Sequence, residues 1–188
     1  MMSVAEPELR RWTTDEYLQA ADLGVFGPEE RLELVNGEIY RMSPQNGPHA
    51  TACDLLAEAL RAAFGGGYLI RGQKPLLLGG SSVPEPDVYV VRGRIRDFAR
   101  QHPTSAELVV EVSDATVRFD MGTKSALYAS AGIQDYWVVV IPERVLVVHR
   151  DPDPAAGIYR SIVRLRATDH VLPLAAPDST IPVEELLP

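Results

Sequence analysis

A strand, helix and strand pattern near the middle of the chain constrains the fold more than any other feature. Residues 107–112 and 136–141 form short apolar runs rich in valine, and the second run suits a strand buried on both faces. Between them, residues 116–131 have the pattern of a helix, which Gly132 ends. Elements in this order indicate a crossover unit, which joins two parallel strands. The sequence therefore predicts an α/β fold.

Further runs indicate a larger sheet around this unit. Strand-like stretches lie at residues 68–78, 87–91, 145–149 and 159–165. Residues 49–64 have apolar side chains at helical spacing, and Gly65 begins the glycine run that stops this helix. We expect a central mixed β-sheet flanked by helices.

The N-terminal part predicts a helix and a hairpin. In the segment 13–21, Thr13 can cap a helix and Glu16 can complete a capping box, and the helix ends by Gly24. In the segment 31–42, two β-prone runs flank Asn36-Gly37, the dipeptide typical of a type I′ hairpin turn.

Composition limits the class of protein and of partner. The 188 residues, 46% of them hydrophobic and 23% charged, suit one globular domain over residues 1–188. The net charge of −8 excludes a broad polycationic surface, so an anionic partner must be held locally. Of the 18 basic residues, only Lys74 and Lys124 are lysines.

The sequence also bears on compartment. Cys53 is the only cysteine, so no intramolecular disulfide can form, and nothing suggests a cysteine-based zinc site. The N-terminal stretch lacks the apolar region of a signal peptide, and no apolar run is long enough to cross a bilayer. We expect a cytoplasmic protein that does not associate with a membrane.

Two carboxylates stand out because they adjoin apolar runs. Asp87 and Glu111 lie in PDVYVV and LVVEV, where an unpaired charge would be costly to bury. A shared divalent cation would compensate them, and carboxylate oxygens suit Mg²⁺ or Mn²⁺. A salt bridge would also do so, and ion pairs are commoner than metal sites.

Lys124 bears on these alternatives. On a regular helix, Asp120, Lys124 and Tyr128 would lie along one stripe, and an Asp–Lys helix pair is the simplest interpretation. A lysine in a chain that otherwise uses arginine nearly everywhere suggests a need for a compact ammonium group.

Six motifs, in order along the chain, are similar to those of a known family. They are ELVNGE at 33–38, SP at 43–44, His49, PEPDVYVV at 84–91, LVVEVSD at 108–114 and the segment 120–137. Together they resemble the Uma-two family of bacterial restriction endonucleases, within the PD-(D/E)XK nuclease superfamily. The resemblance covers nearly the whole chain and implies a restriction endonuclease-like fold.

The resemblance implies a role for each matching residue. Asp87, Glu111 and the backbone carbonyl of Val112 would bind the metal ion. Ser113 stands where the superfamily usually has its lysine, and Lys124 on the next helix takes that role. Glu33 would be an additional acid near the metal.

These roles predict an Mg²⁺-dependent endonuclease, with Mn²⁺ able to substitute, that hydrolyses DNA phosphodiester bonds. We expect a homodimer, so that two sites face two strands. A bound divalent cation lowers the pKa of its water and neutralises charge on the phosphate, while a lysine orients or helps deprotonate the attacking water. The alternatives are a binding or assembly protein that keeps the fold without the chemistry, and a phosphoesterase acting on RNA or small phosphate esters.

Other residues have two interpretations. His49 either lines the site or forms a structural hydrogen bond. A basic cluster follows the Asp87 strand and either meets DNA phosphates beside the site or is simply solvated; its members are Arg92, Arg94, Arg96 and Arg100. Glu38 is expected to face solvent, and three aromatic residues are expected to pack in the core: Tyr128, Tyr136 and Trp137.

Overall fold

The computed structural model describes residues 8–188; residues 1–7, which begin the N-terminal stretch considered above, lie outside the described residues. The elements of the N-terminal half are α1 (Thr14–Asp22), β1 (Leu32–Val35), β2 (Glu38–Arg41), α2 (Gly47–Phe64), β3 (Tyr68–Arg71) and β4 (Val88–Arg92). Those of the C-terminal half are β5 (Leu108–Ser113), α3 (Val117–Phe119), α4 (Ser125–Ser130), β6 (Asp135–Val140), β7 (Val145–Asp153), β8 (Ile158–Arg166), β9 (His170–Val171) and β10 (Ile181–Pro182).

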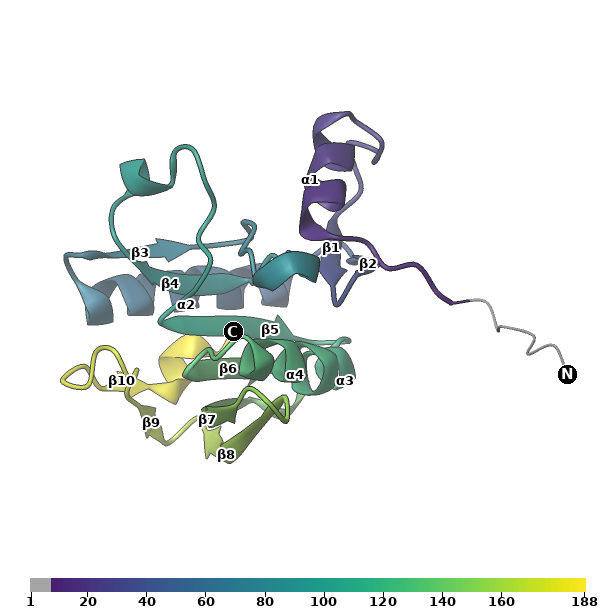
Figure 1. Ribbon diagram of the computed structural model, residues 1–188. Coiled ribbons are helices and arrows are strands. Elements are labelled where there is room, and N and C mark those ends of the chain that lie inside the picture. Colours follow the sequence, from purple (N-terminus) through teal and green to yellow (C-terminus); the bar gives the residue numbers. More distant parts are fainter. Residues whose placement is uncertain (1–7) are drawn as a thin grey trace, which may run out of the picture.

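A six-stranded sheet forms the centre of the fold (Figure 1). Its strand order is β3-β4-β5-β6-β7-β8, and only β5 and β6 pair in parallel. The segment that joins these two strands contains α3 and α4, so the predicted crossover unit and the predicted mixed sheet are confirmed.

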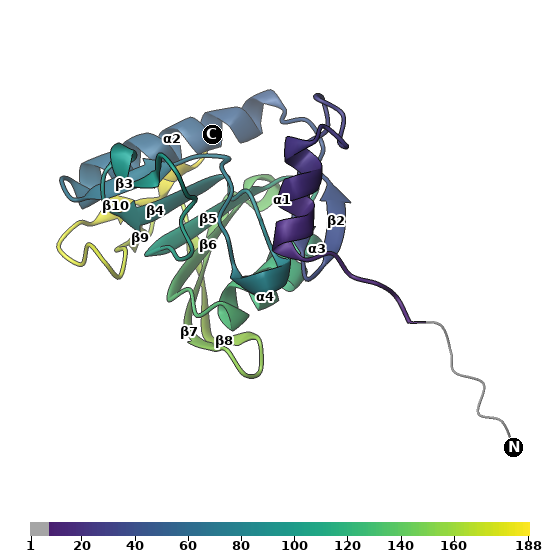
Figure 2. The same cartoon turned by 45° about the horizontal axis from the view of Figure 1, so that its top comes forward.

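Helices cover both faces of this sheet (Figure 2). The face under α2 is apolar: Leu56 and Leu60 pack there against Val110 and Trp137. On the other face, Leu127 of α4 packs against the strand side chains that alternate with those facing α2. Alternation along β5 places Val110 on the α2 side and Val109 on the α4 side, so Glu111 shares the α4 side with Val109.

The N-terminal helix and hairpin form as predicted. Thr13 caps α1: its hydroxyl accepts a hydrogen bond from the Glu16 amide, and the Glu16 carboxylate accepts one from the Thr13 amide. β1 and β2 pair antiparallel around Asn36 and Gly37, whose φ angles of 51° and 78° are those of a type I′ turn. A small separate core of Tyr17, Leu34 and Val83 lies beneath them.

Two predicted elements are wrong in extent. The sequence predicts a strand over residues 68–78, but β3 ends at Arg71, because Gln73 takes a left-handed conformation (φ 49°) and Pro75 has no amide for a strand ladder. The Leu76 amide bonds the Pro84 carbonyl instead, at 2.9 Å.

The helix predicted over residues 116–131 is divided into three parts. A π-helical segment, Asp120–Lys124, separates α3 from α4, and the Ser125 amide reaches back to the Asp120 carbonyl. A π-helical turn adds a residue to the turn and rotates the side chains that follow relative to a regular helix.

Among residues 8–188, no helix combines the length and the hydropathy needed to span a bilayer.

Candidate active site

Strand pairing brings the two singled-out carboxylates together. Asp87 directly precedes β4 and Glu111 lies in β5, and the antiparallel register sets Val88 opposite Val110. The Asp87 amide donates to Glu111 Oε2 at 3.3 Å, and the Val112 amide donates to Asp87 Oδ2 at 2.9 Å. The two acids therefore lie side by side at one end of adjacent strands.

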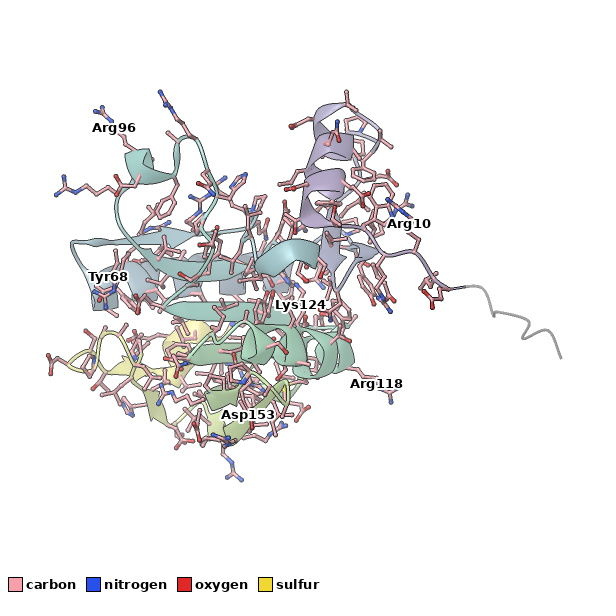
Figure 3. The ribbon with its side chains drawn as sticks, viewed as in Figure 1. Arg10, Tyr68, Arg96, Arg118, Lys124 and Asp153 are labelled. Carbon is pink, nitrogen blue, oxygen red and sulfur yellow. The ribbon has the colours of Figure 1, made fainter. Side chains whose placement is uncertain are left out.

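Lys124 is buried between two acids that are far apart in sequence. Its ammonium nitrogen lies 2.9 Å from Glu111 Oε1 and 2.9 Å from Glu33 Oε2, and its side chain is only 2% exposed. Glu33 comes from β1 of the hairpin. Lys124, which is labelled in Figure 3, comes from the π-helical segment. The structure thus unites the four predicted catalytic residues, which come from four separate elements.

The expected Asp–Lys helix pair is wrong. Asp120 is buried, and its carboxylate accepts a hydrogen bond from the Thr116 hydroxyl at 2.6 Å. Within the described residues, the ion pairs of Lys124 are those with Glu33 and Glu111. The π-helical segment accounts for the difference, because residues four apart in it do not align as in a regular helix.

Charge and burial act in opposite directions on the ionisable groups. Burial lowers the pKa of Lys124, but the charges of Glu111 and Glu33 outweigh burial and raise it, so the ammonium stays charged. Burial raises the pKa of Glu111 well above its ordinary value, although Lys124 opposes this. For Asp87, burial is outweighed by the hydrogen bond and charge of His49, which leave the pKa of Asp87 lowered.

A cleft with a cavity volume of about 120 Å³ opens onto these groups. Arg31 lines it together with Asp87, Glu111 and Lys124, and makes no ion pair within residues 8–188. Because residues i and i+2 of an extended chain point to the same face, Arg31 accompanies Glu33, and this spacing is the signal that sequence reasoning overlooked.

His49 takes part in the site. Its Nε2 lies 3.2 Å from Asp87 Oδ2, and its Nδ1 lies 3.5 Å from Cys53 Sγ. Burial lowers the pKa of His49, but the hydrogen bond and charge of Asp87 outweigh burial and leave it raised. The proximity of Cys53 was not anticipated, although the two residues are four apart on a predicted helix.

Tyr128 is more than a packing residue. It is fully buried, and its hydroxyl donates to Glu111 Oε1 at 2.6 Å. Tyr136 and Trp137 do pack in the core on opposite sides of the sheet. Glu38 is 41% exposed and pairs with Arg11 at 2.8 Å.

The basic cluster lies away from the carboxylates. Arg92 ends β4, five residues beyond Asp87, which corresponds to about 16 Å along a strand. It pairs there with Glu107, and Arg96 lies on the short 3-10 helix Ile95–Phe98 that follows (Figure 3). This placement does not favour a position beside the site for Arg92, Arg94, Arg96 and Arg100, which is one of their two interpretations; their contact with DNA stays a prediction.

Comparisons with known proteins bear on the family and the fold. A family model described as "Uma2: Putative restriction endonuclease" matches residues 14–184. No curated protein matches the chain. A crystal structure of "a putative nuclease" from Anabaena variabilis is similar in fold, with a TM-score of 0.74 and 17% sequence identity over 93% of this chain and 97% of that one. Because the family model spans nearly all of the chain, the protein belongs to the Uma2 family of restriction endonuclease-like proteins.

Proposed function

We propose that the protein is a metal-dependent endonuclease that hydrolyses DNA phosphodiester bonds at the Asp87–Glu111 cleft. Membership of the Uma2 family supports a nuclease. The observation that carries the proposal is the convergence of Asp87, Glu111 and Lys124 on one cleft.

The charges and donor atoms of the cleft suit a hard divalent cation. Glu33, Asp87, Glu111 and Asp120 surround the single ammonium of Lys124, so the acids outnumber it. Among residues 8–188, Asp87 Oδ1 receives only long hydrogen bonds, of 3.4 Å from Gln45 and 3.5 Å from Gln73. Oxygen donors with this excess of negative charge favour Mg²⁺ or Mn²⁺.

Asp87, Glu111 and the Val112 carbonyl would hold this ion. When bound, it supplies a more acidic water and neutralises charge on the phosphate. Mg²⁺ is the cation we expect, with Mn²⁺ able to replace it.

Lys124 then acts as a fixed positive charge. The charges of Glu111 and Glu33 outweigh burial and raise its pKa, which favours the ammonium form, and in that form it would stabilise negative charge that develops on the phosphate. The Glu33 carboxylate accepts a hydrogen bond from the Lys124 ammonium, so we assign to Glu33 the role of positioning that ammonium.

Arg31 would hold a DNA phosphate at the mouth of the cleft. Its guanidinium is a planar group suited to phosphate oxygens, and it makes no ion pair within the described part of the chain. A local contact of this kind suits a protein whose net charge of −8 gives no general attraction to DNA.

The test is cleavage of supercoiled plasmid with Mg²⁺ or Mn²⁺. We expect cleavage by the wild type, its loss on addition of a chelator, and a fall of at least ~100-fold in Glu111→Gln. Glu58→Gln on exposed α2 surface is the matched control and should cleave normally. Intact plasmid with both metals, or cleavage that survives chelation, would contradict the proposal.

The same assay compares DNA with other substrates. RNA and small phosphate esters are run alongside the plasmid, and faster hydrolysis of either would make it the substrate in place of DNA.

We also propose a homodimer in the cytoplasm, because two sites would allow both strands to be cut. Light scattering coupled to gel filtration measures the mass, and a monomer under cleavage conditions would exclude the dimer.

A further inference from the structure

Three metal-ligating side chains of different chemistry meet beside the cleft. His49 and Cys53 lie one turn apart on α2, and Asp87 faces them from the start of β4. One ligand atom from each residue lies within 4.8 Å of the other two. The imidazole already contacts both neighbours, with Nδ1 3.5 Å from Cys53 Sγ and Nε2 3.2 Å from Asp87 Oδ2.

This ligand set differs in kind from the one proposed for Mg²⁺. Thiolate and imidazole ligands suit a borderline cation such as Zn²⁺, which binds sulfur at about 2.3 Å and nitrogen at about 2.0 Å in a tetrahedron. Such a tetrahedron separates its ligand atoms by roughly 3.5 Å. The three ligand atoms lie within 4.8 Å of one another, and Asp87 contacts the imidazole nitrogen that Cys53 does not, so the side chains must draw together around one of the two nitrogens to enclose an ion. Mg²⁺ requires six oxygen ligands and is poorly served by a thiol.

The two sites share one carboxylate. Asp87 belongs to the His49–Cys53–Asp87 cluster and also to the oxygen set formed with Glu111. An ion held on the side of Cys53 uses an Asp87 electron pair and places two positive charges beside the neighbouring position.

We propose that His49, Cys53 and Asp87 form a Zn²⁺ site, with water as the fourth ligand, and that Zn²⁺ bound there competes with Mg²⁺ for Asp87. On binding, the Cys53 thiol gives its proton to solvent and its sulfur bonds the metal. Cys53 alone suggested no zinc site, but the histidine and the carboxylate beside it supply the other protein ligands. Competition at Asp87 makes Zn²⁺ an inhibitor, and this second part rests on the proposed function.

The binding test uses the full chain without substrate. Calorimetric titration with zinc chloride gives the affinity, and Co²⁺ serves as a spectroscopic substitute that absorbs in the near ultraviolet when a thiolate binds it. We expect Cys53→Ser to weaken Zn²⁺ binding at least ~10-fold and to remove the thiolate absorption. The control is Glu58→Gln, an exposed residue further along α2, which should leave both unchanged.

Equal Zn²⁺ affinity in wild type and Cys53→Ser, or a cobalt complex without thiolate absorption, would overturn the site. Circular dichroism of each variant shows that it is folded before titration. His49→Ala provides a second variant, because it removes the imidazole while leaving Cys53 in place.

Competition is tested by repeating the zinc titration at several Mg²⁺ concentrations. We expect the apparent Kd for Zn²⁺ to rise in proportion to Mg²⁺, and an unchanged Kd would overturn the shared use of Asp87. Plasmid cleavage is measured separately: failure to cut with Mg²⁺ counts against the nuclease, whereas the zinc affinities decide the zinc site.

Discussion

Replacing Lys124 by methionine tests whether its ammonium is what allows two carboxylates to remain buried. The side chains of Glu33 and Glu111 are each only 3% exposed, and each lies 2.9 Å from the Lys124 nitrogen. Methionine has a similar length without the charge, so it fills the space and leaves both acids without their cation.

The expected cost follows from breaking a buried ion pair. Removal of one partner typically destabilises a protein by ~3–5 kcal/mol, because the remaining charge is buried without compensation. For a chain of this size, each kcal/mol lowers the Tm by ~2–4 °C, so Lys124→Met should lower the Tm by ~6–20 °C. Lys74→Met, at the other and exposed lysine, should stay within ~0.5 kcal/mol of the wild type.

The cost should also depend on pH. Lys124 lowers the pKa values of Glu33 and Glu111, which burial raises, so its removal raises both pKa values further in the folded state. An acid with a raised folded pKa favours folding below its unfolded pKa, and that stability is lost as the pH rises through the folded pKa. The variant is therefore most impaired near pH 8 and less impaired near pH 5.

Urea denaturation at both pH values measures these differences. In Glu33→Gln/Lys124→Met, one unpaired acid is neutralised, and part of the lost free energy of unfolding should return. A cost below ~1 kcal/mol at pH 8, or a cost that does not shrink at pH 5, would refute the reasoning.

Three further substitutions test other parts of the structure. Tyr128→Phe removes the hydroxyl that donates to Glu111 Oε1 at 2.6 Å and should lower the free energy of unfolding by ~1–3 kcal/mol in urea; a neutral result would show that this bond is dispensable. Burial lowers the pKa of His149 to about 4, so wild-type stability should fall as the pH drops from about 6.5 to 4. This residue contributes at most ~1.4 kcal/mol per pH unit to that fall. His149→Leu should flatten the curve of Tm against pH, and a curve identical to that of the wild type would exclude His149 as the cause. Gly37→Ala should lower the free energy of unfolding by ~1–3 kcal/mol, because the φ angle of Gly37 is +78° and the added Cβ would lie 2.5 Å from Arg11 Cβ. In the control Gly47→Ala, the added Cβ meets no atom within 4 Å. Equal melting temperatures in the two variants would contradict this account.

Local signals in the sequence predicted local structure well. The capping box of Thr13 and the Asn36-Gly37 turn depend on neighbouring residues alone, and both form as expected. The parallel pairing of β5 and β6 followed from the order of elements. These features could be predicted because the chain itself encodes each of them within a few residues or by connectivity.

Features that depend on distant contacts were predicted less well. The π-helical segment that turns Lys124 towards Glu33 has no local sequence signal, and the ion pair joins residues 91 positions apart. The arginine cluster follows Asp87 closely in sequence, but β4 carries Arg92 away from Asp87 to its own far end. Proximity in sequence does not give proximity in space along an extended strand.

The hairpin of β1 and β2 has a consequence for how the site responds to partial unfolding. It is a two-stranded sheet separate from the central one, packed on the small core of Tyr17, Leu34 and Val83, yet it supplies Glu33 to Lys124. Small units of this kind open more readily than a central sheet does. Opening of the hairpin would release one of the two carboxylates that hold the ammonium, so mild heating would break the Glu33–Lys124 pair before the six strands separate.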